Sequence, residues 1–452
     1  KMEIVGMKMI LSVLTFAVVF LTVSCDITER TVSLKEWPNC NEYKEACDKA
    51  KANFSNVVYA KAHAANDSLL YAFSTISIPT IVVARVTGGD IDMHFNWTKL
   101  VDGDSLEDAI TINETFAKVE YKYGVAFTRL FEYFDTENSA DITDPAYGYP
   151  KNNGTDWIIR DFTMFKWTLD TNNTAKNAFI FNATYENNDF NPPDLPENKS
   201  LFGNWSISFM FTVRGDSGRA STMPSMKYEA NETQFDFIMS NFTPTFNKSR
   251  FAVESVLVSQ SKNKNMQINT VDSIDDEYSP GVFQIVNWLS YPEQELSNAY
   301  FQWKPVCYLS ASRGRSVATQ VKHYGLTDMR NVENMTLLLK QSILFGLFGE
   351  DLYNEKVVLA QATNISFGLT DDGYYVGTNY TVWSAALGYG TPPTDTISLT
   401  VIIIISAGLG VPVLVLIFGG IYTCIKKSKA RKRSQYENID SNTVSSNQHI
   451  IN

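Results

Sequence analysis

The segment from Gly215 to Gly218 reads Gly-Asp-Ser-Gly, residue types that surround the nucleophile of some serine hydrolases. Such a serine needs a histidine base, and His63 lies upstream, but Arg219 stands where a further glycine is expected. Asp216-Ser217-Gly218 also resembles half of an aspartic-protease site, but no second such segment supplies the partner carboxylate. Because glycine, aspartate and serine also favour tight turns, we interpret the segment as a turn after a strand.

The same segment contains Arg214-Gly215-Asp216, the tripeptide that integrins recognise. A hairpin turn could expose it, which leaves cell-surface adhesion as one alternative function. The turn interpretation accounts for these residues without that role.

No metal or cofactor site is predicted. Asp275, Asp276 and Glu277 could offer oxygen ligands to calcium, but EF-hand spacing is absent and a solvated acidic turn explains them. The histidines His63, His94 and His323 lack metal-ligand spacing. A glycosidase would need two facing carboxylates, which the sequence of an acidic domain cannot pair. We therefore predict no enzyme, although a membrane-tethered luminal hydrolase remains an alternative.

Cysteines are few. Cys40, Cys47 and Cys307 precede the C-terminal apolar run, Cys25 is retained only if signal cleavage precedes it, and Cys424 ends that run. Proximity favours a Cys40–Cys47 disulfide, and the alternative is that these thiols stay unpaired.

Acceptor asparagines in Asn-X-Ser/Thr are abundant. There are fifteen, all between two apolar runs, and none follows the second run. Because an attached glycan is bulky and hydrophilic, each used acceptor must face solvent. They are Asn53, Asn66, Asn96, Asn113, Asn153, Asn172, Asn182, Asn198, Asn204, Asn231, Asn241, Asn247, Asn334, Asn364 and Asn379.

Tyr436 and Ile439 form a Tyr-X-X-Φ motif after the second apolar run. Such a peptide binds a clathrin adaptor as an extended strand, with its tyrosine and apolar residue in separate pockets. This predicts endocytosis or lysosomal delivery.

The elements that must position these residues are mainly strands. From 205 to 213, apolar residues alternate with polar ones, which predicts a half-buried strand with Asn204 facing outwards. Around Asn182 the aromatic residues likewise fall on the opposite face. Further β-rich stretches are 68–73, 78–86, 123–134, 251–259, 357–367 and 374–383, and the best helical window is 335–348. We predict a mainly antiparallel β-sandwich-like domain.

Two apolar runs divide the chain. Residues 9–23 follow lysines and precede small residues, so we predict a signal peptide over 1–25. Residues 397–425 exceed the roughly 20 residues that span a bilayer, and Pro412 is tolerated there. Six Lys and Arg residues follow within 426–433, which marks the cytoplasmic side. The prediction is a type I protein with a luminal domain over 26–396 and a cytoplasmic tail over 426–452.

Charge separates in the same way. The whole chain carries −11, but residues 26–396 carry −16 and the tail carries +4. The basic residues adjoin a membrane span, so nucleic-acid binding, which depends on cationic contacts to phosphate, is excluded.

Several segments, in the same order, resemble the glycosylated lysosomal membrane protein family. They run from about residue 57 to 439 and are 96–98, 127–130, 273–284, 302–306, 383–384, 387–393 and the motif at Tyr436. Two features depart from that family: residues 440–452 extend the tail, and luminal cysteines are fewer, so family disulfides do not transfer.

The resemblance implies a lysosomal accessory subunit. Its partner would be a multi-spanning transporter of the major facilitator superfamily that exports dipeptides. The subunit would stabilise this transporter, support its lysosomal localisation and shield it from luminal proteases.

Overall fold

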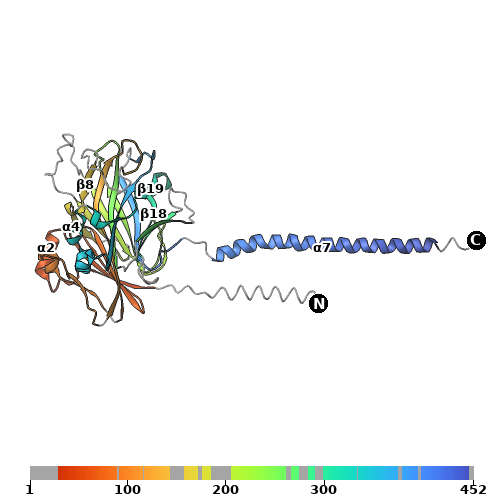
Figure 1. Ribbon diagram of the computed structural model, residues 1–452, viewed down its shortest axis with the longest axis horizontal. Coiled ribbons are helices and arrows are strands. Elements are labelled where there is room, and N and C mark those ends of the chain that lie inside the picture. The colour runs from red at the N-terminus through yellow and green to blue at the C-terminus, as the bar shows by residue number, and fades with distance from the viewer. Residues whose placement is uncertain are drawn as a thin grey trace, which may run out of the picture. The chain divides into compact units, whose positions relative to one another are not determined.

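The structure is a computed structural model that describes residues 29–88, 91–115, 117–142, 157–171, 176–184, 205–260, 266–273, 284–290, 299–332, 334–374, 379–394 and 399–446. These residues belong to two units, a β-rich domain ending at Thr394 and a C-terminal unit starting at Asp395 (Figure 1).

The first sheet contains the long central strands of the domain. Its antiparallel order is β1, β2, β3, β4, β7, β15 and β21, with β19 and β20 both paired to β21 and β8 paired to β7. The strands are β1 Thr31–Glu36, β2 Val57–His63, β3 Asp67–Ser74, β4 Thr80–Gly88, β7 Ala117–Phe134, β8 Trp157–Asp161, β15 Ser249–Gln260, β19 Ala318–His323, β20 Thr327–Asp328 and β21 Val358–Phe367.

The second sheet is also antiparallel, in the order β9, β10, β11, β14, β22, β18, β17 and β16. Because β19 pairs with β18 as well as with β21, it joins the two sheets. The strands are β9 Lys166–Asp170, β10 Ala178–Thr184, β11 Ser206–Val213, β14 Glu232–Ser240, β16 Gln267–Asp272, β17 Gln284–Ser290, β18 Ala299–Tyr308 and β22 Tyr380–Tyr389. Two further two-stranded antiparallel sheets pair β5 Met93–Phe95 with β6 Ile110–Ile112, and β12 Gly218–Arg219 with β13 Lys227–Tyr228.

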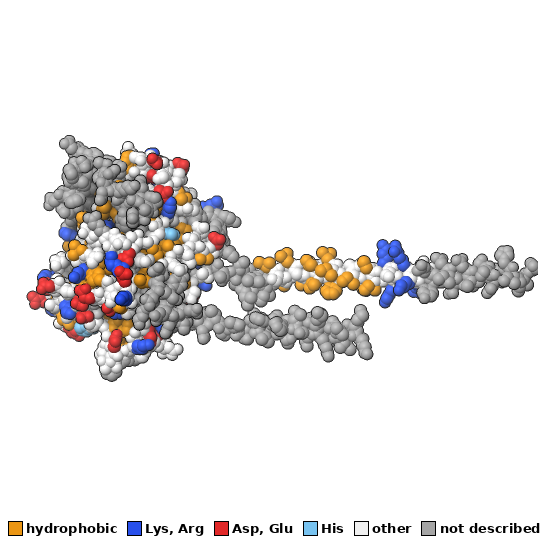
Figure 2. Space-filling view, viewed as in Figure 1, with side chains coloured by type: hydrophobic (Ala, Val, Ile, Leu, Met, Phe, Trp, Pro, Cys, Tyr) orange, Lys and Arg blue, Asp and Glu red, His pale blue; other side chains and the backbone are white. Residues whose placement is uncertain are grey.

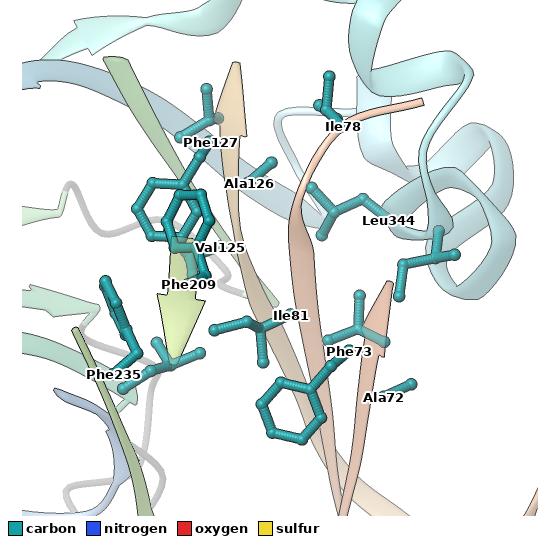
Figure 3. Packing of buried hydrophobic residues seen from close by; sticks show 14 of the residues in the cluster. Ala72, Phe73, Ile78, Ile81, Val125, Ala126, Phe127, Phe209, Phe235 and Leu344 are labelled. Carbon is teal, nitrogen blue, oxygen red and sulfur yellow. The ribbon is translucent and has the colours of Figure 1, made fainter. Parts of the chain in front are cut away.

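Aromatic side chains form the interior between the sheets. The ring centroid of Phe127 on β7 lies 4.7 Å from that of Phe209 on β11 and 5.2 Å from that of Phe235 on β14. Phe73 on β3 lies 5.0 Å from Phe211 on β11, so the two sheets face each other across this layer (Figure 3). Large aromatic rings remove much apolar surface from water, which is the main stabilising term for such a sandwich.

Helices cover the outer face of the first sheet. Leu344 of α5 packs beside Gly124 of β7, on the side of the strands opposite Phe209 (Figure 3). Consequently β7 and β15 are buried on both faces, with almost no exposed position in either central strand. The helices of the domain are α2 Lys44–Ala52, α3 Trp97–Asp102, α4 Met335–Lys340 and α5 Ile343–Phe348, with short 3-10 turns at Phe162–Met164, Arg315–Val317, Met329–Asn331 and Gly349–Tyr353.

The predicted mainly antiparallel β-sandwich is confirmed. The alternation predicted over 205–213 is present in β11, where Ile207, Phe209, Phe211 and Val213 are buried and their neighbours are partly exposed. Two predictions were wrong in detail. The helical window 335–348 is interrupted between Lys340 and Ile343, because Ser342 ends one helix and caps the next by accepting the amide of Leu344. The strand predicted from 374 starts only at Tyr380.

The C-terminal unit contains one long helix, α7 Leu399–Ser446. Its exposed apolar side chains form a band that is followed by Lys and Arg residues (Figure 2). The helix continues through Pro412. Its 48 residues correspond to about 70 Å at the helical rise, more than enough for a bilayer. The predicted signal peptide, 1–25, lies outside the described residues.

Candidate functional site

Most predicted glycan acceptors in the described part of the chain lie at the surface. They belong to different connections between elements and to helix and strand ends, from Asn53 to Asn379. The exposed acceptors are Asn53, Asn66, Asn113, Asn241, Asn247, Asn334 and Asn379.

Three acceptors are partly buried. Asn96 caps α3 by accepting the amide of Lys99 at 3.1 Å, and the Asn182 carbonyl accepts the Ser208 hydroxyl at 2.7 Å. The Asn231 amide donates to the carbonyl of Tyr389. In each case a side chain proposed to carry sugar also holds local structure. Asn153, Asn172, Asn198 and Asn204 lie outside the described residues.

Asn364 does not meet the requirement that an acceptor face solvent. It lies in the middle of β21, paired in register with Glu254 of β15, and is only 3% exposed. Ser366 of the same acceptor triplet is fully buried. The expectation that Asn364 faces outwards is therefore wrong, because its strand is buried on both faces by the packing around it.

Cys40 and Cys47 form a disulfide, with 5.7 Å between their Cα atoms. It ties the start of α2 to the turn that follows β1. Cys307 is a buried free thiol whose pKa is raised by burial, and Cys424 is a free cysteine on α7.

Arg214 of the integrin-type tripeptide is engaged inside the domain. Its guanidinium lies 3.8 Å from the ring centroid of Tyr228, and its Nε donates to the Gln234 side chain at 3.1 Å. Asp216 and Ser217 are exposed in a bend before β12. An integrin ligand must present both charged side chains, so this packing of Arg214 disfavours adhesion and supports the turn interpretation.

The side chains considered for catalysis are not assembled into a site. The His63 ring nitrogen Nδ1 lies 2.9 Å from the Ser68 hydroxyl on the neighbouring strand, and His94 pairs with Glu42. Within the described ranges, no group of three His, Cys, Asp or Glu side chains could hold a metal ion. The acidic run Asp275, Asp276 and Glu277 lies outside those ranges.

A polar groove of about 840 Å³ lies beside the Gly215 turn. Four basic residues, Arg30, Lys176, Arg214 and Arg219, line it together with two acidic ones, Glu29 and Asp216. However, Arg30 pairs with Asp67 at 2.8 Å, and Arg219 donates to the carbonyl of Ser225 at 2.9 Å. Arg30 and Arg219 thus already make contacts within the domain around the groove.

Three fully buried glutamates, Glu132, Glu232 and Glu254, were not singled out from the sequence. Glu132 on β7 accepts from Arg160, Thr245 and Ser249, with 2.8 Å to the Arg160 guanidinium. Glu232 on β14 accepts from the Tyr300 hydroxyl at 2.7 Å. Glu232, Gln234 and Asp236 occupy alternate positions of β14 and so share one face of the strand. From the sequence alone, these polar residues indicate a face exposed to solvent. Burial of that face depends on the covering segments, which strand periodicity does not reveal.

The sorting motif, Tyr436 to Ile439, lies within the backbone of α7 rather than in an extended segment. Good helix formers such as Ala430, Lys432 and Glu437 favour this continuation beyond the apolar residues. Adaptor binding in the extended form would therefore require the end of α7 to unwind.

Comparisons with known proteins agree over most of the chain. Residues 56–430 match the family model described as glycosylated lysosomal membrane protein. Glycosylated lysosomal membrane protein A of Xenopus laevis is 33% identical to this chain, over 85% of this chain and 89% of its own length. Glycosylated lysosomal membrane protein B of Xenopus laevis is 32% identical, over 83% of this chain and 87% of its own length. The Homo sapiens glycosylated lysosomal membrane protein is 26% identical over 85% of this chain and 87% of its own.

Proposed function

Because the chain belongs to the glycosylated lysosomal membrane protein family, we propose that it is an accessory subunit of a lysosomal transporter. It is a single-pass lysosomal membrane glycoprotein with a large luminal domain. The partner is a multi-spanning transporter of the major facilitator superfamily that exports dipeptides. The subunit stabilises this partner, supports its lysosomal localisation and shields it from luminal proteases.

The observation that carries this proposal is the spread of exposed acceptors over a tightly packed β domain. Seven described acceptors are exposed, and they stand at helix ends, at strand ends and in loops from Asn53 to Asn379. Glycans at these positions obstruct proteases sterically, and the backbone of paired, buried strands is not accessible to cleavage while the sheets stay folded. A protein with these properties can survive among lysosomal proteases and cover a neighbour that lacks sugars.

Helix α7 supplies a surface for association in the membrane. Gly408, Gly410, Gly419 and Gly420 have no heavy atom near the position of a Cβ, so they leave space on the helix surface. Small residues let two membrane helices approach closely and pack. The proposal therefore includes a contact between α7 and a helix of the transporter.

The test is to delete the protein and measure transporter abundance in isolated lysosomes. We expect abundance to fall, and expect inhibitors of luminal proteases to restore it. Re-expression of the wild-type chain should also restore it, whereas a variant with Asn→Gln at the seven exposed acceptors should restore less. Normal transporter abundance after deletion would refute the role.

The tail provides the second part of the proposed role. A clathrin adaptor binds Tyr436 and Ile439 and thereby directs the assembled pair to lysosomes.

No observation on the described residues specifically favours the hydrolase or adhesion alternatives.

A further inference from the structure

Three neighbouring strands of the second sheet bring a buried carboxyl and a buried hydroxyl together. In the pairing register, Gly388 of β22 is opposite Glu232 of β14 on one side and opposite Tyr300 of β18 on the other. A Cβ at position 388 would collide with the Tyr300 ring, so the glycine leaves the space through which Tyr300 reaches Glu232. The Tyr300 hydroxyl donates to Glu232 Oε2 at 2.7 Å.

The surroundings of this pair exclude solvent. Glu232 and Tyr300 are fully buried, and apart from Tyr300 only the Gln234 side chain is placed to favour the ionised form of Glu232 through a hydrogen bond. A buried carboxylate without a full set of donors is costly, whereas the neutral acid is tolerated.

The charged and titratable groups around Glu232 do not neutralise it. Arg214 is the cation that acts on it most, but its guanidinium already stacks on Tyr228 and bonds to Gln234. Glu229 repels the ionised form, and the tyrosines facing this region are neutral. The neutral tyrosines are Tyr71 on β3, Tyr123 on β7 and Tyr300 on β18. The Arg30 guanidinium lies near Tyr71 but is paired with Asp67.

We propose that Glu232 and Tyr300 form a proton-controlled clamp that holds β14, β22 and β18 together in the acidic lysosomal lumen and loosens their packing near neutral pH. In acid Glu232 is neutral and the three strands pack around it. Near neutral pH its ionisation places an uncompensated charge in the interior. The domain is thus most resistant to opening in the compartment where proteases are most active. This inference does not depend on which partner the protein has.

The direction of the pH dependence follows from proton binding. Burial raises the pKa of Glu232 to about 8, from an ordinary value of 4.5. Between these values the folded state binds a proton that the unfolded state has lost, so the free energy of unfolding falls as pH rises. The contribution of this carboxyl is fully present below the unfolded pKa and is lost as pH rises towards about 8.

The experiment compares full-length wild type in detergent with Glu232→Gln, which keeps the shape but cannot ionise, and measures Tm at about pH 5 and about pH 7.5. We expect the Tm of the wild type to be lower at the higher pH, and we expect this difference in Tm to be at most half as large in Glu232→Gln. Glu45→Gln, which removes an exposed carboxylate on α2, is the control and should retain the fall. An unchanged fall in Glu232→Gln would overturn the proposal.

A second measurement needs no variant, and so stands if Glu232→Gln fails to fold. Hydrogen exchange of the wild type at the same two pH values, corrected for intrinsic rates, should show faster opening of β14, β18 and β22 near neutral pH. Helices α4 and α5, which pack against β7 and β4 of the first sheet, serve as the internal reference. Equal protection of these strands at both pH values would contradict the clamp.

Discussion

At the scale of single residues, burial decides what an asparagine or a glutamate can do, whatever motif surrounds it. Asn334 and Asn364 have equally good acceptor triplets, but Asn334 is exposed at the start of α4 and Asn364 is enclosed within β21. The sugar must stay in water, so only the first position is compatible with the folded domain.

This contrast gives the first prediction. Mass spectrometry of glycopeptides from the full-length protein should show sugar on Asn334 and none on Asn364. Correspondingly, Asn334→Gln should increase electrophoretic mobility by the amount that the loss of one glycan causes, whereas Asn364→Gln should leave mobility unchanged. Sugar on Asn364 in folded protein would mean that β21 does not occupy the buried position described above.

The buried ion pair between Glu132 and Arg160 gives the second prediction. Both side chains are at most 1% exposed, and three residues donate to the Glu132 carboxylate. Glu132→Ala leaves a buried cation without this partner, so we expect unfolding free energy to fall by about 3–5 kcal/mol in chemical denaturation. Asp141→Ala removes an ion pair with Lys322 whose side chains are half exposed, and it should cost at most about 1 kcal/mol. Equal effects of the two variants would contradict this difference.

At the scale of elements, the position of the α4–α5 helices depends on a glycine. A Cβ on Gly124 of β7 would lie 2.5 Å from the carbonyl oxygen of Ile81 and 2.9 Å from Leu344 Cδ2 of α5. The strand can therefore pack closely against both β4 and α5 only without a side chain at this position.

The third prediction follows from this contact. Gly124→Ala should lower the unfolding free energy by about 1–3 kcal/mol, because either β4 or α5 must shift to make room. Gly314→Ala is the matched control, since no heavy atom lies within 4 Å of its added Cβ. Thermal unfolding of both full-length variants measures the difference, and a neutral Gly124→Ala would show that α5 does not pack on β7 as described.

Sequence patterns predicted these elements unequally well. β11 was predictable because one of its faces is partly solvated, so apolar and polar residues alternate. β7 and β15 are buried on both faces, and their sequences indicate a strand but not which residues face solvent. The break between α4 and α5 falls at three polar residues, Lys340, Gln341 and Ser342, of which Ser342 is a recognisable capping residue.

The same limit applies to the candidate site. Acceptors in turns, such as Asn241 and Asn247, are exposed as sequence reasoning expects. The burial of Asn364 and Glu232 could not be predicted, because each lies on a strand face covered by segments distant in the sequence. The backbone amide of Arg214, for example, donates to the carbonyl of Glu232 at 3.0 Å from a separate part of the chain.

At the scale of the whole molecule, an acidic luminal domain, an apolar helix and a basic tail are joined in one chain. The luminal domain meets lysosomal contents only after the protein has reached lysosomes. Because Tyr436 lies within α7, an adaptor that binds the motif as an extended strand would have to capture an unwound form of the tail, and its apparent affinity would be reduced in proportion to the fraction that is unwound.

This arrangement gives the last prediction. Tyr436→Ala should move the full-length protein from lysosomes to the cell surface, because an adaptor pocket loses the aromatic ring that fills it. Val444→Ala, in the same tail but outside the motif, should leave lysosomal delivery intact. Surface biotinylation together with lysosome isolation measures both pools. Unchanged lysosomal arrival of Tyr436→Ala would contradict the sorting role, and delivery would then have to depend on the luminal domain, α7 or another part of the tail.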